Sequence, residues 1–281
     1  MTAKKAAVPA PAYVTTPNGN LEINLTIKSA AITQSYQKSL RRLAAETEID
    51  GFRKGKAPLS LIEKKINKET VYREVIKDLI PQMYADTIKK HQLKPLVSPE
   101  IQLVSAEEGQ DWQIKAITCQ KPSVTLNNYR AAVAKARTPA TKKEPRENQV
   151  AAAFAILLKT CQVTVPETLI TQEVNRMLSR LIDQTNRLGI SVEQYLASVK
   201  QTPEQIRHQY YHQAEDTLKL EFILAAIAEA EKTAVSDQEV QAALNSISSA
   251  KTDKNKETEE QRYHLKQLLL KQKTIDNLIT L

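Results

Sequence analysis

The sequence has little glycine and few aromatic residues, and both shortages narrow the range of structures it can form. Only 5 of its 281 residues are glycine, and 5% are aromatic. Alanine, leucine, glutamine, lysine and glutamate are common instead, and these residues favour helices. A helix-rich protein is therefore expected, and 281 residues are enough for two domains with buried cores.

Long apolar runs and clustered cysteines are also missing. No stretch of about 18 apolar residues occurs, so no membrane-spanning helix is expected. Residues 1–19 lack the apolar centre of a signal peptide and are expected to be a disordered leader. The two cysteines, Cys119 and Cys161, have no metal-ligand spacing. We interpret them as small buried side chains in a protein of the reducing cytoplasm.

The charge that is present is distributed unevenly. The formal net charge is +8, with 41% hydrophobic and 26% charged residues, which is typical of a soluble globular protein. Residues 1–130 hold 20 Lys and Arg against 13 Asp and Glu, whereas residues 151–281 hold 15 against 17. An anionic partner, if there is one, is therefore expected to bind the front half.

Residues 20–128 have the pattern of one α+β domain. Apolar residues alternate over 21–27, which predicts a half-buried strand, and a helix with one apolar face follows from Ser29. A longer helix over 69–90 contains Pro81, which should bend or break it. Strands near 101–104 and 112–118, with a turn at Glu108–Gly109, predict a hairpin.

The rest of the chain is expected to be a linker followed by helices. Residues 129–148 are rich in basic residues and proline, with little that could be buried, and predict a linker. Residues 149–281 predict an all-α multi-helix domain, which begins with a broad apolar stripe between Leu169 and Ile182. Ser or Thr followed three residues later by Gln or Glu, a helix-start signal, occurs at positions 191, 202 and 236. The overall fold class is thus α+β, dominated by helix.

The candidate binding site is the stretch IDGFRKGKAP at positions 49–58. Its two glycines allow a tight loop, and an apolar ring at the tip of that loop would need a partner to bury it. Lysines continue the basic run to position 68, and Glu63 is the sole acidic residue between positions 53 and 68. Such cations suit phosphates. The candidate binding residues are Gly51, Phe52, Arg53, Lys54, Gly55 and Lys56.

The loop sequence allows two other interpretations. A nucleotide-binding P-loop needs glycine where Asp50 stands and a hydroxyl where Ala57 stands, so nucleotide binding is not expected. The simpler interpretation is a basic turn whose charges are only solvated. The glycines, the exposed ring and the long run of cations argue against it.

The loop GFRKGKAP resembles the signature loop of bacterial trigger factor, a family of ribosome-associated chaperones. LEINLTI before it and DLIPQMYADTIKKHQLKPLVSPEI after it follow that family's ribosome-binding domain in order. VTVPETLITQEVNRMLSRL and TPEQIRHQYYHQAEDTLKLEFILAAIAEAE are similar to its helical C-terminal domain. The resemblance covers roughly residues 20–281. In place of the family's prolyl-isomerase domain, of the FK506-binding type, stand only residues 129–148.

The resemblance implies an ATP-independent cytoplasmic chaperone without isomerase activity or cofactor. Phe52, Arg53 and Lys54 would contact a ribosomal protein and rRNA beside the exit tunnel, Gly51 and Gly55 would shape the loop, and the helical domain would shield unfolded or nascent chains. Lys56 is added on electrostatic grounds. The client range and a homodimer of the free protein stay open. The alternatives are a ribosome-independent holdase and a basic nucleic-acid-binding module.

Other candidate sites have less support in the sequence. His208 and His212 lie four residues apart on an expected helix, a spacing that can bind a metal, but no third ligand lies nearby in the sequence. No metal site is therefore expected. No catalytic motif was found either, so an enzyme is not expected.

Overall fold

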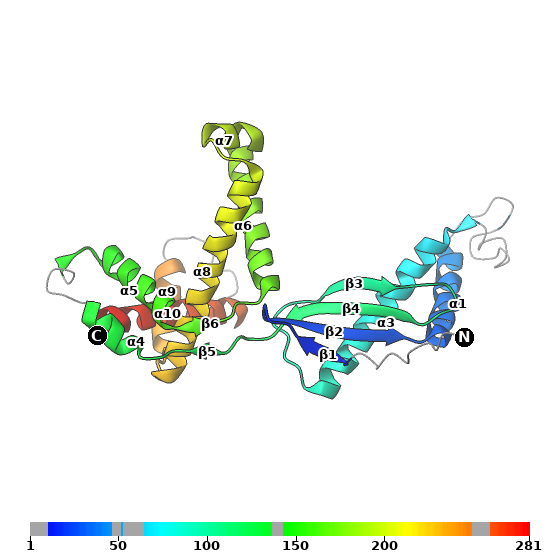
Figure 1. Ribbon diagram of the computed structural model, residues 1–281, viewed down its shortest axis with the longest axis horizontal. Coiled ribbons are helices and arrows are strands. Elements are labelled where there is room, and N and C mark those ends of the chain that lie inside the picture. Colours follow the sequence, from blue (N-terminus) through cyan, green and yellow to red (C-terminus); the bar gives the residue numbers. More distant parts are fainter. Residues whose placement is uncertain (1–10, 47–51, 53–64, 137–142, 249–258) are drawn as a thin grey trace, which may run out of the picture. The chain divides into compact units, whose positions relative to one another are not determined.

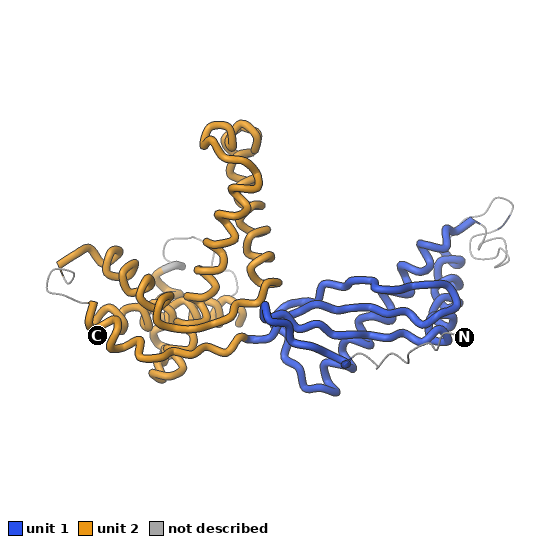
Figure 2. The backbone as a smooth tube through the Cα atoms, viewed as in Figure 1, with its two compact units in different colours: residues 1–121 blue, residues 122–281 orange. Residues whose placement is uncertain are grey.

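The structure is a computed structural model that describes residues 11–46, 52, 65–136, 143–248 and 259–281. The chain divides into two compact units, residues 1–121 and 122–281 (Figure 2). Among its described residues the first unit combines a sheet with two helices, and the second unit is built almost wholly of helices (Figure 1). The expected fold class, α+β and helix-dominated, is confirmed.

The sheet of the first unit has four antiparallel strands in the order β1-β2-β4-β3. These strands are β1 (Tyr13–Thr15), β2 (Asn20–Ile27), β3 (Glu100–Ser105) and β4 (Trp112–Cys119). The expected strand over 21–27 and the expected hairpin are both present, and Gly109 in the hairpin turn has a φ of +81°. The left-handed backbone at this turn explains why a glycine stands there.

Helices α1 (Ser29–Glu46) and α3 (Lys68–His91) pack on each other and on one face of this sheet. The alternating residues of β2 lie opposite those of β4, with Ile23 paired to Ala116 and Leu25 to Ile114, and all four are buried. Helix α3 continues through Pro81 without a break. The apolar face of α1 is buried as predicted at Ile32 and Leu40.

The second unit has seven helices and one small sheet within its described residues. The helices are α4 (Tyr129–Ala136), α5 (Arg146–Thr160), α6 (Glu167–Arg187), α7 (Val192–Ser198), α8 (Pro203–Ala230), α9 (Asp237–Ser248) and α10 (Glu259–Thr280). The sheet pairs β5 (Val124–Thr125) with β6 (Gln162–Val163). Reciprocal capping bonds are present at Ser191, Thr202 and Ser236, as predicted.

Part of the expected linker belongs to the core of the second unit. Residues 129–136 form α4, and the side chains of Tyr129 and Val133 are buried beside Leu157 and Ile227. The prediction failed because basic and proline residues dominate residues 129–148, while the short apolar stripe of α4 has only these two members. The helical unit accordingly begins near residue 122, earlier than the expected position 149.

Two of the helices extend away from this core as a hairpin, joined at the tip by α7 (Figure 1). We call residues 167–218, which comprise α6, α7 and the first part of α8, the arm. Two apolar clusters hold the arm together, one around Val174 and Ala214 and one around Leu181 and Ile206. The second part of α8 enters the core through Ile223 and Ile227.

Candidate functional site

The two helices on either side of the candidate loop in the sequence, α1 and α3, pack against each other. Leu40 and Ala44 near the end of α1 form a buried cluster with Val71 in the first turns of α3. Asn67 caps α3, its side-chain oxygen accepting a hydrogen bond from the backbone N–H of Glu69 at 3.0 Å. The described helices on either side of the loop are therefore fixed to each other, and we call this α1–α3 packing the base.

Ion pairs strengthen this base. The Arg42 guanidinium lies 2.8 Å from a carboxylate oxygen of Glu74 and 3.4 Å from one of Asp78, which joins α1 to α3. The pKa of Glu74 is lowered, mainly by a hydrogen bond from Lys77 and also by Arg42. Because these groups are partly exposed, each pair stabilises the base modestly.

Of the six candidate binding residues, Phe52 lies among the described residues, and it is 43% exposed. Phe52 therefore keeps a large part of its apolar surface in contact with solvent, where a partner could bury it. Gly51, Arg53, Lys54, Gly55 and Lys56 lie outside the described residues. Their roles stay a prediction.

One lysine of the predicted cationic run is engaged inside the protein. The ammonium of Lys68 lies 3.0 Å from a carboxylate oxygen of Glu108, in the turn between β3 and β4. That hydrogen bond raises the pKa of Lys68. Lys68 therefore contributes less to an external phosphate contact than the sequence suggested, because an outside anion would have to compete with Glu108.

Aromatic side chains support the packing beneath this end of the domain. The rings of Tyr36 and Tyr72 have centroids 5.0 Å apart, and those of Tyr72 and Trp112 are 5.4 Å apart. They join α1, α3 and β4 in tilted arrangements of the kind aromatic pairs prefer. Burial raises the pKa of Tyr72.

The second unit offers apolar surface at the far end of the arm. The side chains of Ile182, Leu188 and Val199 are 45%, 73% and 41% exposed there. The expected stripe between Leu169 and Ile182 is mostly core, since Ile170, Val174 and Leu181 are buried. The exposed residues form the part of the arm that an apolar partner could contact.

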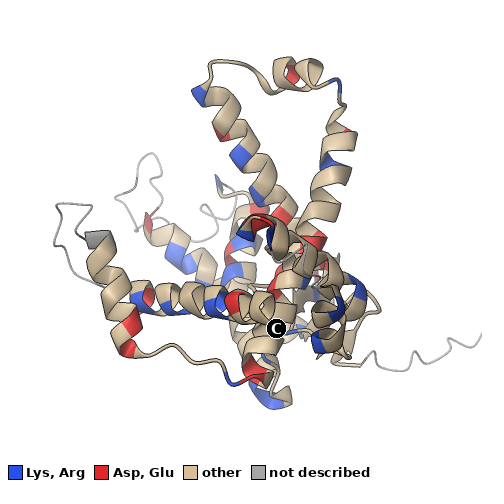
Figure 3. Cartoon of the chain, turned by 90° about the vertical axis from the view of Figure 1, so that its left-hand side faces the viewer, with Lys and Arg blue, Asp and Glu red and all other residues tan. Residues whose placement is uncertain are grey.

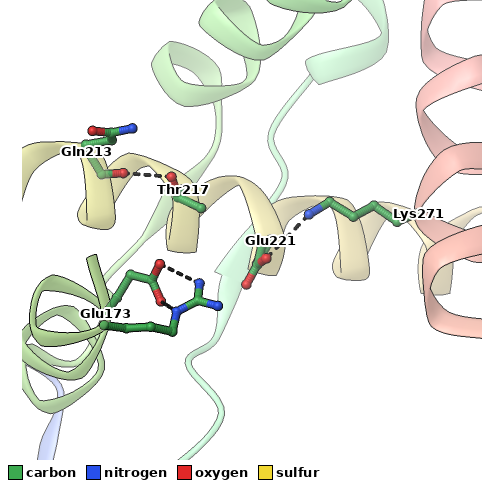
Figure 4. Close-up of polar contacts among 6 residues, drawn as sticks. Glu173, Gln213, Thr217, Glu221 and Lys271 are labelled. Atoms are coloured by element: carbon green, nitrogen blue, oxygen red, sulfur yellow. Dashed lines mark hydrogen bonds and ion pairs between the residues drawn. The ribbon is translucent and has the colours of Figure 1, made fainter. Parts of the chain in front are cut away.

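A groove of about 450 Å³ lies between α8 and α10. Its lining includes the apolar residues Leu224, Ala225 and Leu270 and the charged residues Glu221 and Lys271. Figure 4 shows Glu221 of α8 and Lys271 of α10 reaching toward each other, at 3.4 Å. Nearby on α6, Glu173 accepts hydrogen bonds from Arg176.

The two helices of the arm are also joined at its inner end by a partly buried polar contact. The Tyr211 hydroxyl of α8 donates a hydrogen bond to Glu167 at the start of α6, at 2.8 Å. This bond, together with burial, raises the pKa of Tyr211 to about 12. Tyr211 therefore stays protonated and keeps donating at physiological pH.

Charge in the second unit is mixed rather than basic. Residues of both signs are spread over its helices (Figure 3).

No helix of the described part is long and apolar enough to span a membrane. Among the described residues, no group of three or more His, Cys, Asp or Glu side chains is arranged to hold a metal ion. Cys119 and Cys161 are buried free thiols whose pKa values are raised by burial, which agrees with the sequence interpretation.

Two protein-family models match the chain. The model of bacterial trigger factor protein matches residues 13–153, and that of the bacterial trigger factor C-terminus matches residues 125–280. The chain belongs to the bacterial trigger factor family. Because the two matches overlap, no residues lie between them for a prolyl-isomerase domain, and this trigger factor lacks it.

Individual trigger factors match the chain over part of their length. That of Moorella thermoacetica is 35% identical over 107 residues, which are 38% of this chain and 24% of the relative. That of Bdellovibrio bacteriovorus is 33% identical over 112 residues, which are 40% and 25% of the two chains. The chain thus spans about a quarter of these curated relatives.

A solved trigger factor structure shares the fold along nearly the whole chain. It was reported under "Promiscuous Substrate Recognition in Folding and Assembly Activities of the Trigger Factor Chaperone". The two chains superpose with a TM-score of 0.68 over 95% of this chain and 99% of the other, at 13% identity. At that identity the likeness establishes the trigger factor fold.

Proposed function

We propose that this trigger factor is an ATP-independent chaperone of the cytoplasm that docks beside the ribosomal exit tunnel. The loop at positions 51–56 binds a ribosomal protein and nearby rRNA, and the helical unit shields nascent or unfolded chains. The observation that carries the proposal is the family match of both halves, with an exposed Phe52 where the family signature loop stands.

The geometry of the first unit supports the docking role. Helices α1 and α3, on either side of the loop in the sequence, are fixed to each other by a buried cluster and by Arg42, and Phe52 between them is exposed. Arg53 and Lys54 supply contacts to phosphates or acidic side chains, which position a partner without reading base sequence. Phe52 supplies apolar burial worth about 1.5–3 kcal/mol when complete.

The second unit supports the client-binding role. Exposed Ile182, Leu188 and Val199 on the arm and the groove between α8 and α10 provide separate apolar contacts within a polar surface. Many weak contacts admit unrelated clients and allow ready release. A client leaves as it buries its own apolar surface in folding, so no nucleotide is needed.

Ribosome co-sedimentation of the full chain tests the docking proposal. The chain should pellet with ribosomes at low salt and progressively less as salt rises to moderate concentrations, because exposed cations are screened. Failure to pellet at low salt would leave the ribosome-independent holdase. Pelleting that does not change with salt would contradict the role of Arg53 and Lys54.

A refolding assay separates the chaperone activity from isomerase activity. We expect the full chain, without ATP, to raise the folded yield of an aggregation-prone client whose slow phase is proline isomerisation. The rate of that phase should not change, since the uncatalysed reaction takes tens to hundreds of seconds and no isomerase domain is present to accelerate it. A clear acceleration would contradict the proposed loss of isomerase activity, and an unchanged yield would contradict the chaperone role.

A further inference from the structure

Two histidines on the arm bring their ring nitrogens together. His208 and His212 lie one turn apart on α8, and their Nε2 atoms are 3.3 Å from each other. The ring centroids are 4.5 Å apart, with the rings nearly perpendicular. Both side chains are exposed, so a solvated ion can reach them.

This separation suits two ligands of one tetrahedral metal ion. Zinc binds histidine nitrogen at about 2.0–2.1 Å and prefers tetrahedral geometry. Two nitrogens 3.3 Å apart, each at that bond length, enclose an angle at the metal of about 104–111°. That range includes the tetrahedral angle, so the separation of the two nitrogens already fits one ion.

We propose that His208 and His212 form a binding site for one borderline divalent cation, with zinc as the reference ion. Two histidines at this spacing on one helix face are a recognised zinc-binding pattern. The residue after His208 is Gln209, whereas zinc proteases of the H-E-x-x-H type carry a catalytic glutamate there. The site therefore binds the ion without providing peptide hydrolysis.

A carboxylate stands behind one of the rings. Glu215 has an oxygen 4.0 Å from Nδ1 of His212, on the side away from His208, and also pairs with Lys219 at 2.6 Å. Metal-binding histidines commonly donate their other ring N–H to such a group, which fixes the tautomer and strengthens the ligand. Glu215 needs to move only a short way to accept that bond.

Two coordination positions are left for groups from outside the site. No third His, Cys, Asp or Glu of the described chain is placed to coordinate an ion together with another two. Water or a ligand from another molecule, including a second copy of the same histidine pair, therefore completes the tetrahedron. A bound ion links two successive turns of α8 in the arm, and it stabilises the folded state because unfolding separates its ligands.

Calorimetric titration of the full chain with zinc chloride, in a buffer that does not bind zinc, tests the site. His208→Ala and His212→Ala should each weaken zinc binding by about tenfold or more, because the second ligand then no longer binds intramolecularly. His264→Ala is the matched control, since it removes an exposed histidine of α10 and should leave the affinity unchanged. Zinc should raise the melting temperature of the parent and of His264→Ala, but not that of His208→Ala or His212→Ala.

The number of zinc ions bound per chain identifies the groups in the two open coordination positions. One zinc per chain assigns water to the open positions, and one zinc per two chains assigns them to a second histidine pair. Equal affinities of the parent and both single variants would overturn the proposal, as would an absence of zinc binding by the parent. Binding that survives both substitutions but disappears on thiol alkylation would assign the ion to Cys119 or Cys161 and would also overturn it.

Discussion

Replacing Phe52, Arg53 and Lys54 together by alanine is expected to abolish co-sedimentation with ribosomes. Burial of the Phe52 ring is worth about 1.5–3 kcal/mol, and a hydrogen bond to a charged group about the same. The combined loss is then about 5 kcal/mol or more, which corresponds to over a thousandfold in dissociation constant. The fold should be unaffected, because the buried clusters of α1 and α3 contain none of the three residues.

The chain offers a matched control for this triple variant. Leu188, Arg187 and Lys200 at the end of the arm comprise the same classes of side chain, one large apolar residue and two cations. Their joint replacement by alanine changes the net charge by the same amount and should leave ribosome binding close to that of the parent. If the loop variant pellets as well as this control, the assignment of the docking site to the loop is wrong.

Replacing Tyr129 by alanine is expected to destabilise the second unit by about 3–5 kcal/mol, the range seen for large aromatic residues removed from cores. The side chain is 7% exposed and packs in the main cluster of that unit. Its hydroxyl donates a hydrogen bond to Glu231 at 2.7 Å, so the truncation also removes a partner from a largely buried carboxylate. Chemical denaturation followed by circular dichroism measures the free energy of unfolding.

Two control variants separate the contribution of the Tyr129 ring from that of its hydroxyl and from that of an exposed tyrosine. Tyr129→Phe keeps the ring and loses the hydrogen bond, so it should cost only about 1 kcal/mol. Tyr263→Ala removes a tyrosine that is 67% exposed and should change the free energy of unfolding by less than about 0.5 kcal/mol. If Tyr129→Ala were as mild as Tyr263→Ala, α4 would contribute nothing to the core, and residues 129–136 would behave as a linker after all.

Features with a strong local pattern were predicted well from the sequence. The alternation over residues 21–27 became β2, and the pairs Ser191–Gln194 and Thr202–Gln205 became capping boxes. In each case the physical cause lies within a few neighbouring residues. For the strand it is the two-residue alternation of side chains, and for the caps it is the pair of reciprocal hydrogen bonds.

Features that depend on distant residues were missed. Strands β5 and β6 have two residues each, too few to show a period, and they pair across a separation of almost 40 positions. The ion pair of Lys68 with Glu108 likewise joins residues 40 positions apart. The sequence identified Lys68 as part of a cationic run, but only the fold brings Glu108 to it.

For the candidate site, the sequence indicated the binding residues, and the structure showed how the helices on either side of them pack together. The exposure of Phe52 agrees with a loop that faces a partner. The packing of the helices on either side of that loop depends on Leu40, Ala44 and Val71, which the sequence showed only as apolar positions on two separate helices. Long-range packing of this kind has no signature in a local window.

Helix α8 belongs to both the arm and the core of the second unit, because it runs from Pro203 to Ala230 without a break. At 1.5 Å per residue, its 28 residues extend about 42 Å. Ala214 is fully buried against α6, and Ile227 is fully buried in the core. A force applied at the outer end of the arm would therefore be transmitted along α8 to the core, because a sharp bend in this helix would require backbone hydrogen bonds to break.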